Sequence, residues 1–353
     1  MLFGKLTLLN KGLFIVAGLL LCCGAFYFII DSLSKPEVLV LSGQTMGTQY
    51  NIQIAETVSK DQLASLPVSI QERLHTLDKE IFSTYSAHSE VSVFNQSAPG
   101  QRFNVSEELA EVLLISRQVY ELTQGAFDIT IAPLVFLWGF GPEFNNQDIP
   151  DLKDIEQALM NTGIEKISFD EITSTLHKNS ELQLDFSAIA KGYAVDEIAK
   201  LLENMGIENY LVEIGGELLS RGFKPDGTEW QLAIEQPQAG EQSVQQLIGM
   251  NGMRLAIAGS GSYRNYFEYE GAQYSHELDP KTGWPVSHDL VAVTVIHESA
   301  ALADAYATAL MVMGVDDGLI FANEQKIATY FLQKDPTGIM ARYNAGFTSF
   351  LRH

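Results

Sequence analysis

The stretch ADAYATAL, residues 303–310, places an aspartate and a threonine four positions apart in an alanine-rich segment that predicts a helix. Side chains four apart share a helix face, so Asp304 and Thr308 are expected to direct a carboxylate and a hydroxyl at one point. Two hard oxygen ligands on one side, completed by water and phosphate, typically hold Mg²⁺. The structural alternative is that Asp304 favours the helix dipole near the helix start and Thr308 packs.

A second stretch, SHELDPKTG at residues 275–283, precedes this helix in the chain and carries a histidine beside a turn signal. His276 can act as a base near neutral pH; its structural alternative is a side chain that only hydrogen-bonds its strand neighbours. Asp279 either orients the loop or the imidazole, or it belongs to the Asp-Pro turn alone. The stretch therefore supplies the candidates for proton transfer.

Five further blocks precede these two in the chain. They are GQTMGTQY at 43–50, GAFDITIAPL at 125–134 with WGFG at 138–141, DFSAIAKGYAVD at 185–196, VEIGGE at 212–217 and GSGSYR at 259–264. The third block places an acid, a hydroxyl and a lysine around an expected helix N-terminus, where main-chain N–H groups favour anions. Taken in this order, the blocks resemble the ApbE family of FAD:protein FMN transferases, from about Gly43 to about Gly314.

The resemblance implies an Mg²⁺-dependent enzyme that transfers the FMN moiety of FAD to a threonine hydroxyl of a target redox protein. The product is a phosphoester and AMP is released, so catalysis is mainly positioning and charge neutralisation. The implied metal site lies between Asp304, Thr308 and the main-chain carbonyl of Ala188, and His276 activates the incoming hydroxyl. Some relatives carry an acid just before the threonine; this chain has Ala307 there, so weaker metal binding is expected.

The resemblance also implies a set of residues that bind FAD. Flat rings need apolar and aromatic walls, carboxylates accept hydrogen bonds from ring or ribose groups, and a lysine can face a phosphate. The set comprises Met46, Tyr85, Ala126, Phe127, Asp128, Asp185, Lys191 and Leu278. The glycines around Ser260 offer main-chain N–H groups to a phosphate, or they form an ordinary turn. Trp138 and its neighbouring glycines are expected to be structural.

Composition restricts the partners. The formal net charge is -22 and the pI is near 4.6, so the surface repels nucleic acid. An anionic dinucleotide must then be held by local features, for which a metal, a helix N-terminus, Lys191 and Arg264 are the candidates. The implied acceptors are flavin-carrying subunits of membrane redox complexes, modified within a Ser/Thr-Gly-Ala-Thr-like motif. This chain has no such motif, so self-modification is not expected.

The N-terminus predicts a membrane anchor. Lys5 and Lys11 precede an apolar run at residues 13–30, which is close to the length that crosses a bilayer. We expect a signal anchor at 1–31 and a tether at 32–42. The catalytic domain, 43–353, is then on the periplasmic side of a bacterial inner membrane. Lipidation at Cys22 is disfavoured because a leucine precedes it, and a cleaved signal peptide ranks third.

Periodicity and the resemblance together predict an α+β fold of largely antiparallel sheets with packed helices, related to the T-fold. Ser299 is the expected N-cap of the Asp304 helix and Gly314 its end. Other expected helices span 59–81, 106–122, 151–161 and 188–205. Expected strands span 48–55, 210–214, 230–234, 255–258, 291–296, 327–333 and 347–351, with a hairpin at 167–185 that turns near Lys178-Asn179.

Two alternative functions stay open at this point. The same site could hydrolyse FAD to FMN and AMP with water as the acceptor, or the chain could be a non-catalytic, membrane-anchored flavin-binding protein. Loss of AMP that depends on Mg²⁺ separates the enzymes from the carrier. A serine hydrolase built from Ser260, Ser262, His276 and Asp279 is disfavoured because no Gly-x-Ser-x-Gly elbow is present.

Overall fold

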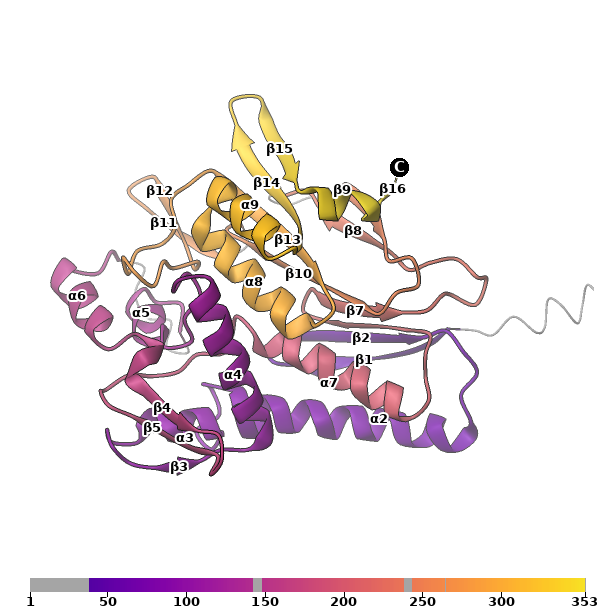
Figure 1. The fold of residues 1–353 in the computed structure, drawn as a ribbon, viewed down its shortest axis with the longest axis horizontal. Helices are drawn as coiled ribbons and strands as arrows, with labels where there is room; N and C mark the ends of the chain where they lie inside the picture. The colour runs from indigo at the N-terminus through magenta and orange to yellow at the C-terminus, as the bar shows by residue number, and fades with distance from the viewer. Residues whose placement is uncertain (1–37, 142–147, 238–242, 264, 353) are drawn as a thin grey trace, which may run out of the picture.

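One eight-stranded antiparallel sheet organises the protein, as seen in the computed structural model of residues 38–141, 148–237, 243–263 and 265–352 (Figure 1). Its strand order is β1-β2-β6-β7-β10-β13-β14-β15. The strands are β1 (Leu39–Thr45), β2 (Thr48–Ile54), β6 (Tyr210–Ile214), β7 (Glu217–Arg221), β10 (Leu255–Gly261), β13 (Leu290–His297), β14 (Ala328–Asp335) and β15 (Gly338–Tyr343). Antiparallel pairing throughout, with packed helices, confirms the predicted α+β class.

Helices cover one face of this sheet (Figure 1). They are α2 (Lys60–His75), α4 (Glu107–Leu122), α7 (Ala190–Asn204) and α8 (Ala300–Met313), with α9 (Val315–Glu324) beside α8. In β10, Ala256 and Ala258 join the core beneath the helices, whereas Ile257 joins a separate core on the other face. This alternation follows from the two-residue period of a strand. Small side chains on β10 and α8 let the helix lie close to the sheet.

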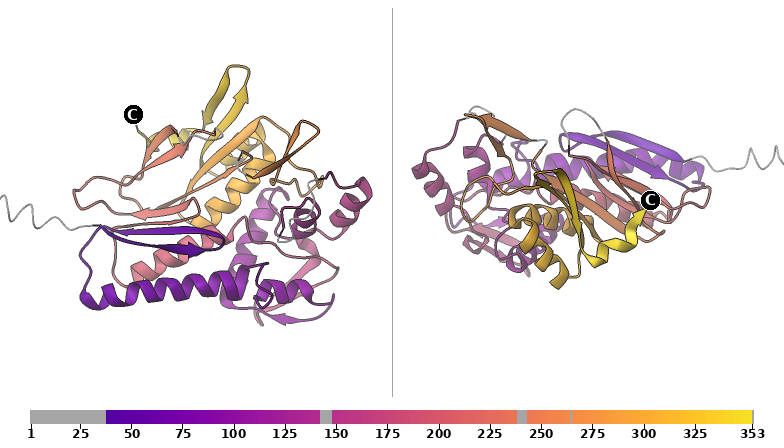
Figure 2. Two further views of the ribbon diagram at one scale, coloured as in Figure 1. Left: turned by 180° about the vertical axis from the view of Figure 1, so that it is seen from behind. Right: turned by 90° about the horizontal axis from the view of Figure 1, so that it is seen from above.

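A smaller sheet lies over part of the other face, with the strands of the large sheet between it and the helices (Figure 2). It contains β8 (Gln231–Glu235), β9 (Val244–Gly249) and β16 (Leu351–Arg352), in the order β16-β9-β8. Trp230, Ile248 and Phe347 are buried in the core beneath it. The small sheet therefore forms one wall above the large one.

The remaining elements are short and lie outside the two sheets described so far. They are α3 (Glu90–Gln96), α5 (Ala132–Leu137), α6 (Leu152–Met160), the sheet of β3 (Phe103–Asn104), β5 (Thr175–Lys178) and β4 (Ile167–Asp170), and the hairpin of β11 (Tyr266–Tyr269) and β12 (Ala272–Ser275). Three turns are not α-helical: a π-helix at Thr76–Phe82 and 3₁₀-helices at Ile164–Lys166 and Ala345–Phe350.

The helix boundaries follow the capping residues in the sequence. Ser299 accepts a hydrogen bond from the N–H of Leu302 at the start of α8, and Gly314 ends that helix with φ +77°. Ser106 caps α4 in the same way, and Gly206, with φ +78°, follows α7. These boundaries confirm the predictions because caps act through local hydrogen bonds.

Three predicted boundaries were wrong. The hairpin at 167–185 turns at residues 171–174, where Asp170 Oδ1 accepts the N–H groups of Ile172 and Thr173 and locks the turn. Residues 345–350 form a 3₁₀-helix capped by Asn344, so only Leu351–Arg352 of the last predicted strand is extended. Residues 39–42, expected to belong to the tether, are part of β1 because they pair with β2.

The N-terminal prediction concerns residues outside the described ones. Within the described residues, no helix combines the length and the apolar character that a membrane crossing requires. The segment at 1–31 therefore stays a prediction.

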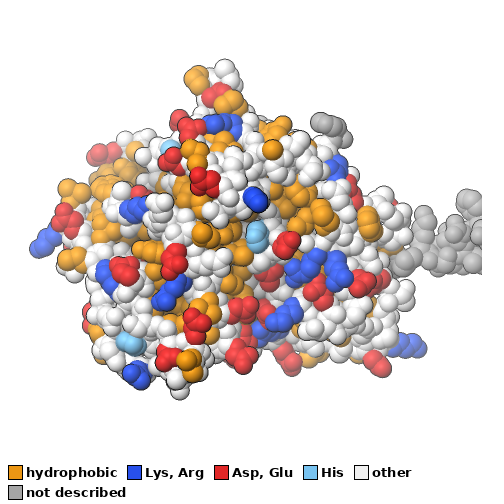
Figure 3. All heavy atoms as spheres, viewed as in Figure 1, with side chains coloured by type: hydrophobic (Ala, Val, Ile, Leu, Met, Phe, Trp, Pro, Cys, Tyr) orange, Lys and Arg blue, Asp and Glu red, His pale blue; other side chains and the backbone are white. Residues whose placement is uncertain are grey.

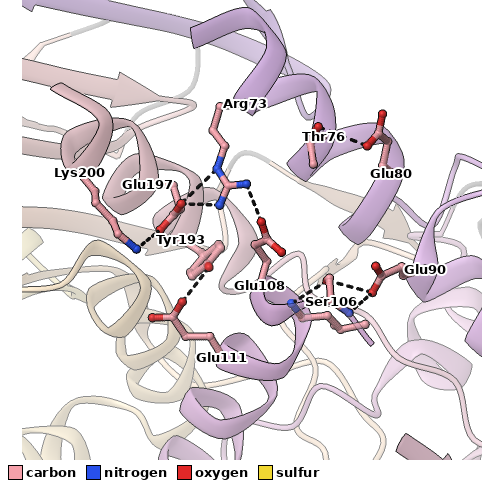
Figure 4. Close-up of polar contacts among 11 residues, drawn as sticks. Arg73, Thr76, Glu80, Glu90, Ser106, Glu108, Glu111, Tyr193, Glu197 and Lys200 are labelled. Carbon is pink, nitrogen blue, oxygen red and sulfur yellow. Dashed lines mark hydrogen bonds and ion pairs between the residues drawn. The ribbon is translucent and has the colours of Figure 1, made fainter. Parts of the chain in front are cut away.

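An ion-pair cluster ties three helices together at one end of the helical layer (Figure 4). The Arg73 guanidinium of α2 bonds Glu108 of α4, at 2.6 Å, and Glu197 of α7. Tyr193 of α7 donates to Glu111 of α4 at 2.8 Å. The planar guanidinium of Arg73 thus donates hydrogen bonds to both carboxylates at once. Elsewhere on this face, acidic and basic side chains are interspersed (Figure 3).

We predict that Gly192→Ala destabilises the protein by about 1–3 kcal/mol through overpacking. A Cβ at Gly192 would overlap the carbonyl oxygen of Ala300 and lie 2.8 Å from Asp304 Cβ, so α7 and α8 must separate. Denaturant unfolding measures the change. Gly346→Ala is the matched control, because a Cβ there meets Asn344 Oδ1 at an ordinary 3.5 Å. Equal stability of the two variants would contradict the close helix contact.

Candidate active site

The first block of the sequence forms the tight turn between β1 and β2. Met46 has φ +49° and Gly47 has φ +72°, the left-handed pair expected of a two-residue type I′ turn. Methionine is unusual in this conformation, and its N–H donates to Asp78 Oδ2 at 2.9 Å. The buried carboxylate of Asp78 therefore fixes the turn that presents Met46.

Asp78 comes from the π-helical turn at Thr76–Phe82, which continues α2. Such wide turns are rare and concentrate at functional sites. The apolar periodicity predicted one continuous helix over 59–81. It gave no sign of the change from α-helix to π-helix at Thr76. The site residue Asp78 was consequently missed.

A cavity of about 460 Å³ opens beside this turn. It brings together four of the residues implicated in binding FAD, namely Met46, Tyr85, Asp185 and Lys191. Phe82 and Phe186 add aromatic walls, and Tyr85, with 72% of its surface exposed, stands at the rim. Aromatic and apolar walls with polar groups between them are suited to a flat, polar ring system.

Ala126, Phe127, Leu278 and Asp128 do not line this cavity, and all four are buried. The block that contains the first two is nevertheless joined to the cavity. The N–H of Asp185 donates to the carbonyl of Ile129 at 2.7 Å, so the two blocks run side by side. Residues 126–129 therefore form a second layer of packing outside the residues that line the cavity.

Asp128 is nearly buried in the same block. Its Oδ1 accepts the N–H of Thr130 at 2.8 Å and the hydroxyl of Thr130 at 2.7 Å. Burial raises the pKa of Asp128 to about 6, although the two bonds from Thr130 oppose the shift. A group of this kind changes its charge in the range where many enzymes work.

Lys191 stands between the cavity and a cluster of buried acids. Its Nζ lies 2.6 Å from Glu217 Oε1, and Asp304 and Glu277 complete the cluster. Burial alone lowers the pKa of Lys191, but the charges of Asp304 and Glu217 outweigh it and raise the pKa. Burial and the charge of Asp304 raise the pKa of Glu217 to about 7, while Lys191 opposes the shift.

The sequence analysis did not single out Glu217 and Glu277. Glu217 is the last residue of the VEIGGE block and Glu277 follows His276, so both acids belong to sequence blocks that carry the family resemblance. The signal that they belong to the site is burial, since Glu217 is 3% and Glu277 is 7% exposed. Acids are rarely buried without a partner or a ligand.

Of the predicted metal ligands, Asp304 lies where α7 and α8 cross and Thr308 lies one helical turn further along α8, against β10. Asp304 Oδ2 accepts the N–H of Gly192 at 3.0 Å, which places the carboxylate beside the first turn of α7, just after Ala188. Thr308 Oγ1 is 3.5 Å from Ser260 Oγ. Burial raises the pKa of Asp304, so a cation would stabilise its ionised form.

The chemistry of this set fits a hydrated divalent cation. Glu217 Oε2 is buried and has no hydrogen-bond partner, which leaves an acceptor available to a water of hydration. Among the described residues, no three His, Cys, Asp or Glu side chains are grouped as metal ligands. The predicted set would therefore rely on the Asp304 carboxylate, the Thr308 hydroxyl and the Ala188 carbonyl, while Ala307 is fully buried and adds no ligand.

His276 lies at the end of the β11–β12 hairpin with 36% of its side chain exposed. Its Nδ1 is 3.0 Å from the carbonyl oxygen of Asn265. A carbonyl only accepts, so Nδ1 carries the proton and Nε2 keeps the lone pair of a base. Nε2 is 3.7 Å from Glu277 Oε1, and the ring of Phe140 meets the imidazole edge-on.

Asp279 makes the turn that follows. Its Oδ1 accepts the N–H of Lys281 at 2.9 Å and its Oδ2 the hydroxyl of Thr282 at 3.1 Å. Of the roles predicted for Asp279, orientation of the loop and the turn itself are therefore realised. Within the described part of the chain, the Asp279 carboxylate bonds Lys281 and Thr282 rather than His276, and Ser262 Oγ faces the carbonyl of Val291, so the hydrolase triad is not assembled.

Trp138 holds this loop from below and is fully buried. Its indole N–H donates to the carbonyl of Gly283 at 2.8 Å, and its ring stacks on Tyr274 with 5.9 Å between centroids. This confirms the predicted structural role. Arg264, the other cation proposed for phosphate, lies outside the described residues.

Comparison with known proteins agrees with this arrangement. The model of the ApbE family matches residues 46–331. An FAD:protein FMN transferase of Vibrio cholerae is 40% identical over 329 residues, which cover 93% of this chain and 97% of that protein. The FAD:protein FMN transferase of Escherichia coli K12 is 38% identical over 344 residues, covering 94% and 96%.

Solved structures give the same result. The flavin transferase ApbE from Vibrio cholerae superimposes with a TM-score of 0.80 at 39% identity, covering 89% of this chain and 99% of that one. The apo form of the flavinyl transferase ApbE from Pseudomonas stutzeri superimposes with a TM-score of 0.79 at 38% identity, covering 88% and 96%. The family model spans Met46, Lys191 and Asp304, and the chain therefore belongs to the ApbE family.

Proposed function

We propose that this chain is an FAD:protein FMN transferase that moves the FMN moiety of FAD onto a threonine of another protein. The observation that supports this most directly is a shared residue. Lys191 lines the ring-sized cavity and also pairs with the buried acids at the crossing of α7 and α8. The phosphates of an FAD bound in the cavity would thus lie beside Lys191 and the candidate metal ligands. Among the described residues, this is the only place where a lysine ammonium lies beside those ligands.

The residues of the cluster position the phosphates. Asp304, Thr308 and the carbonyl of Ala188 would hold Mg²⁺, which neutralises charge on the phosphate oxygens when it is bound. Lys191 contributes a second positive charge beside the proposed metal ligands. Phosphoryl transfer needs little more from a protein than this positioning.

His276 would serve as the base for the acceptor. Its Nε2 takes the proton from the threonine hydroxyl while Nδ1–H stays on the carbonyl of Asn265. The threonine oxygen then bonds to the FMN phosphorus, and the bond from that phosphorus to the bridging oxygen breaks. AMP leaves with that oxygen, so atoms and charges balance.

The partners follow from this reaction. The proposed acceptors are flavin-carrying subunits of membrane redox complexes, and the proposed place is the periplasmic side of the inner membrane, with residues 1–31 as the anchor. The decisive assay incubates the full-length chain with FAD, Mg²⁺ and a threonine-bearing acceptor domain. An acceptor mass gain equal to FMN that chelation abolishes supports the transferase. AMP release without such a gain indicates hydrolysis, and bound, intact FAD indicates a carrier.

We predict that Asp304→Asn lowers turnover by at least about a hundredfold, since it removes the one ionised ligand of the proposed metal site. Asparagine can still accept the N–H of Gly192, and it removes a buried charge, so the fold should persist without loss of stability. Product formation and thermal unfolding are measured on the same sample. Full activity in the folded variant would remove Asp304 from the site.

We predict that His276→Ala lowers the rate of transfer by about 10²–10⁴-fold while the Kd for FAD changes little. The imidazole is placed to move a proton rather than to line the ring cavity. Single-turnover transfer and a flavin fluorescence titration separate the two effects. An equal loss of FAD binding and of transfer would indicate a structural histidine.

We also propose that the ionised Asp128 accepts a hydrogen bond from FAD, as the family resemblance implies, and we therefore predict that FAD binds about tenfold more weakly at pH 5 than at pH 7. The pKa of about 6 means that Asp128 is protonated at pH 5 and must release that proton on binding. Binding therefore weakens as pH falls through 6. Asp128→Asn should bind weakly with no change over this range, and the same pH slope in both proteins would contradict the role.

A further inference from the structure

A second cavity, of about 530 Å³, lies on the other face of the large sheet. We propose that this groove binds the threonine-bearing segment of the acceptor protein as an extended strand added to β10. The inference rests on the proposed transferase function, because it assigns a place to the second substrate of that reaction. Nothing in the transfer chemistry described above uses this groove.

The first observation is an unpaired length of β10. On one side, β10 pairs with β13 as far as Gly261, which lies opposite Ala292. On the other side, its pairing with β7 stops at Ile257, opposite Leu218. Continuing this register, Ala258 lies opposite Glu217, the first residue of β7, so residues 259–261 extend past β7 with a partner strand on one side only. An open strand edge of this kind is a ready template for another strand.

The hydrogen-bond pattern of β10 shows which of its main-chain groups face away from β13. The N–H of Ser262 donates to the carbonyl of Val291 on β13. Hydrogen-bonded pairs alternate along an antiparallel ladder, so Ser260 also faces β13 and the main-chain groups of Gly259 and Gly261 face the open side. Among the described residues, neither glycine makes a main-chain bond to the β6–β7 turn. The N–H of Gly216 in that turn bonds Glu213 instead.

The lining of the groove fits the side chains of an extended peptide. Leu218, Ile257 and Ala292 form its floor on the large sheet. The small sheet supplies the wall, through Leu232, Ile234 and Ile248. Main-chain bonds at an edge give affinity, and apolar sites for alternate side chains give selectivity. The groove provides both along one strand length.

The groove also meets the proposed active site. Thr48 and Gly215 line the groove, while Gly47 and Lys191 line the flavin cavity. A Cβ at Gly215 would lie 2.7 Å from Thr48 Cγ2 and 3.3 Å from Lys191 Cδ, so these residues form a thin common wall.

Side chains of a strand alternate between faces, which determines how a bound segment would lie. On β10, the Ser260 side chain points to Thr308 on the helical side, and Gly259 opens into the groove. A threonine that points to the helical side would approach the acids and Lys191. The residues immediately before and after it would then lie in the groove.

Two substitutions at one position test main-chain pairing. Gly259→Pro removes the main-chain N–H of residue 259, which faces the open side. It removes no hydrogen bond to β13, and edge strands tolerate proline at such a position. Gly259→Ala keeps that N–H, and its Cβ would meet only the carbonyl oxygen of Val293, at 3.5 Å. For a synthetic peptide with one threonine in Ser-Gly-Ala-Thr, we expect Gly259→Pro to raise KM at least about fivefold. Gly259→Ala should change KM less than twofold.

The Kd for FAD, measured on both variants, is expected to match that of the wild type. If Gly259→Pro binds FAD normally and its KM for the peptide equals that of the wild type, the groove is not the acceptor site. If the wild type fails to modify the peptide, the proposed function fails, and the groove is then judged by a second experiment.

The second experiment needs no turnover. The same peptide carries a photoreactive residue immediately before its threonine and is irradiated with the FAD-loaded, full-length chain. Cross-links mapped by mass spectrometry to the groove floor or wall, such as Leu232 or Ala292, support the proposal. Cross-links confined to other surfaces, or none at saturating peptide, overturn it.

Discussion

The close crossing of α7 and α8 is the constraint on which the site depends. Gly192 has no Cβ, so its N–H reaches Asp304 Oδ2 and the first turn of α7 lies against α8. The same approach brings Lys191 beside Asp304 and Glu217, which are acids buried on different elements. A wider spacing of the two helices would move Lys191 away from Asp304 and leave that buried carboxylate without its cation, and burial of unpaired charge is costly. Helix packing and site electrostatics are therefore one arrangement.

Local signals in the sequence predicted much of the fold and part of the site. Ser106, Ser299 and Gly314 marked helix ends correctly because a cap depends only on the neighbouring turn. The four-residue spacing of Asp304 and Thr308 placed both on one face of α8, as the structure has them. The ordered blocks added the family, and with it the cavity that Met46 shares with Lys191.

The remaining features depend on contacts between distant segments. Glu217 belongs to the site because β7 turns it toward the helices, and no local pattern states which face of a strand is buried. Asp78 reaches Met46 only because a π-turn changes the helix pitch. The hairpin at 167–185 was misplaced since Asp170, rather than the Lys178-Asn179 pair, supplies the hydrogen bonds of its turn. In each case the deciding partner lies outside the motif that the sequence displays.

The strand order of the large sheet also determines when the protein can fold during synthesis. β2 has β1 as its local partner, but its other neighbour is β6, with Ile54 opposite Tyr210. Pairing Ile54 with Tyr210 closes all the residues between them into one long loop of chain, and strand pairs so distant in the sequence form slowly. A nascent chain ending before Tyr210 exposes an apolar hairpin edge to aggregation. The ribosome must therefore complete more than half of the chain before the β1–β2 hairpin can join the rest of the large sheet.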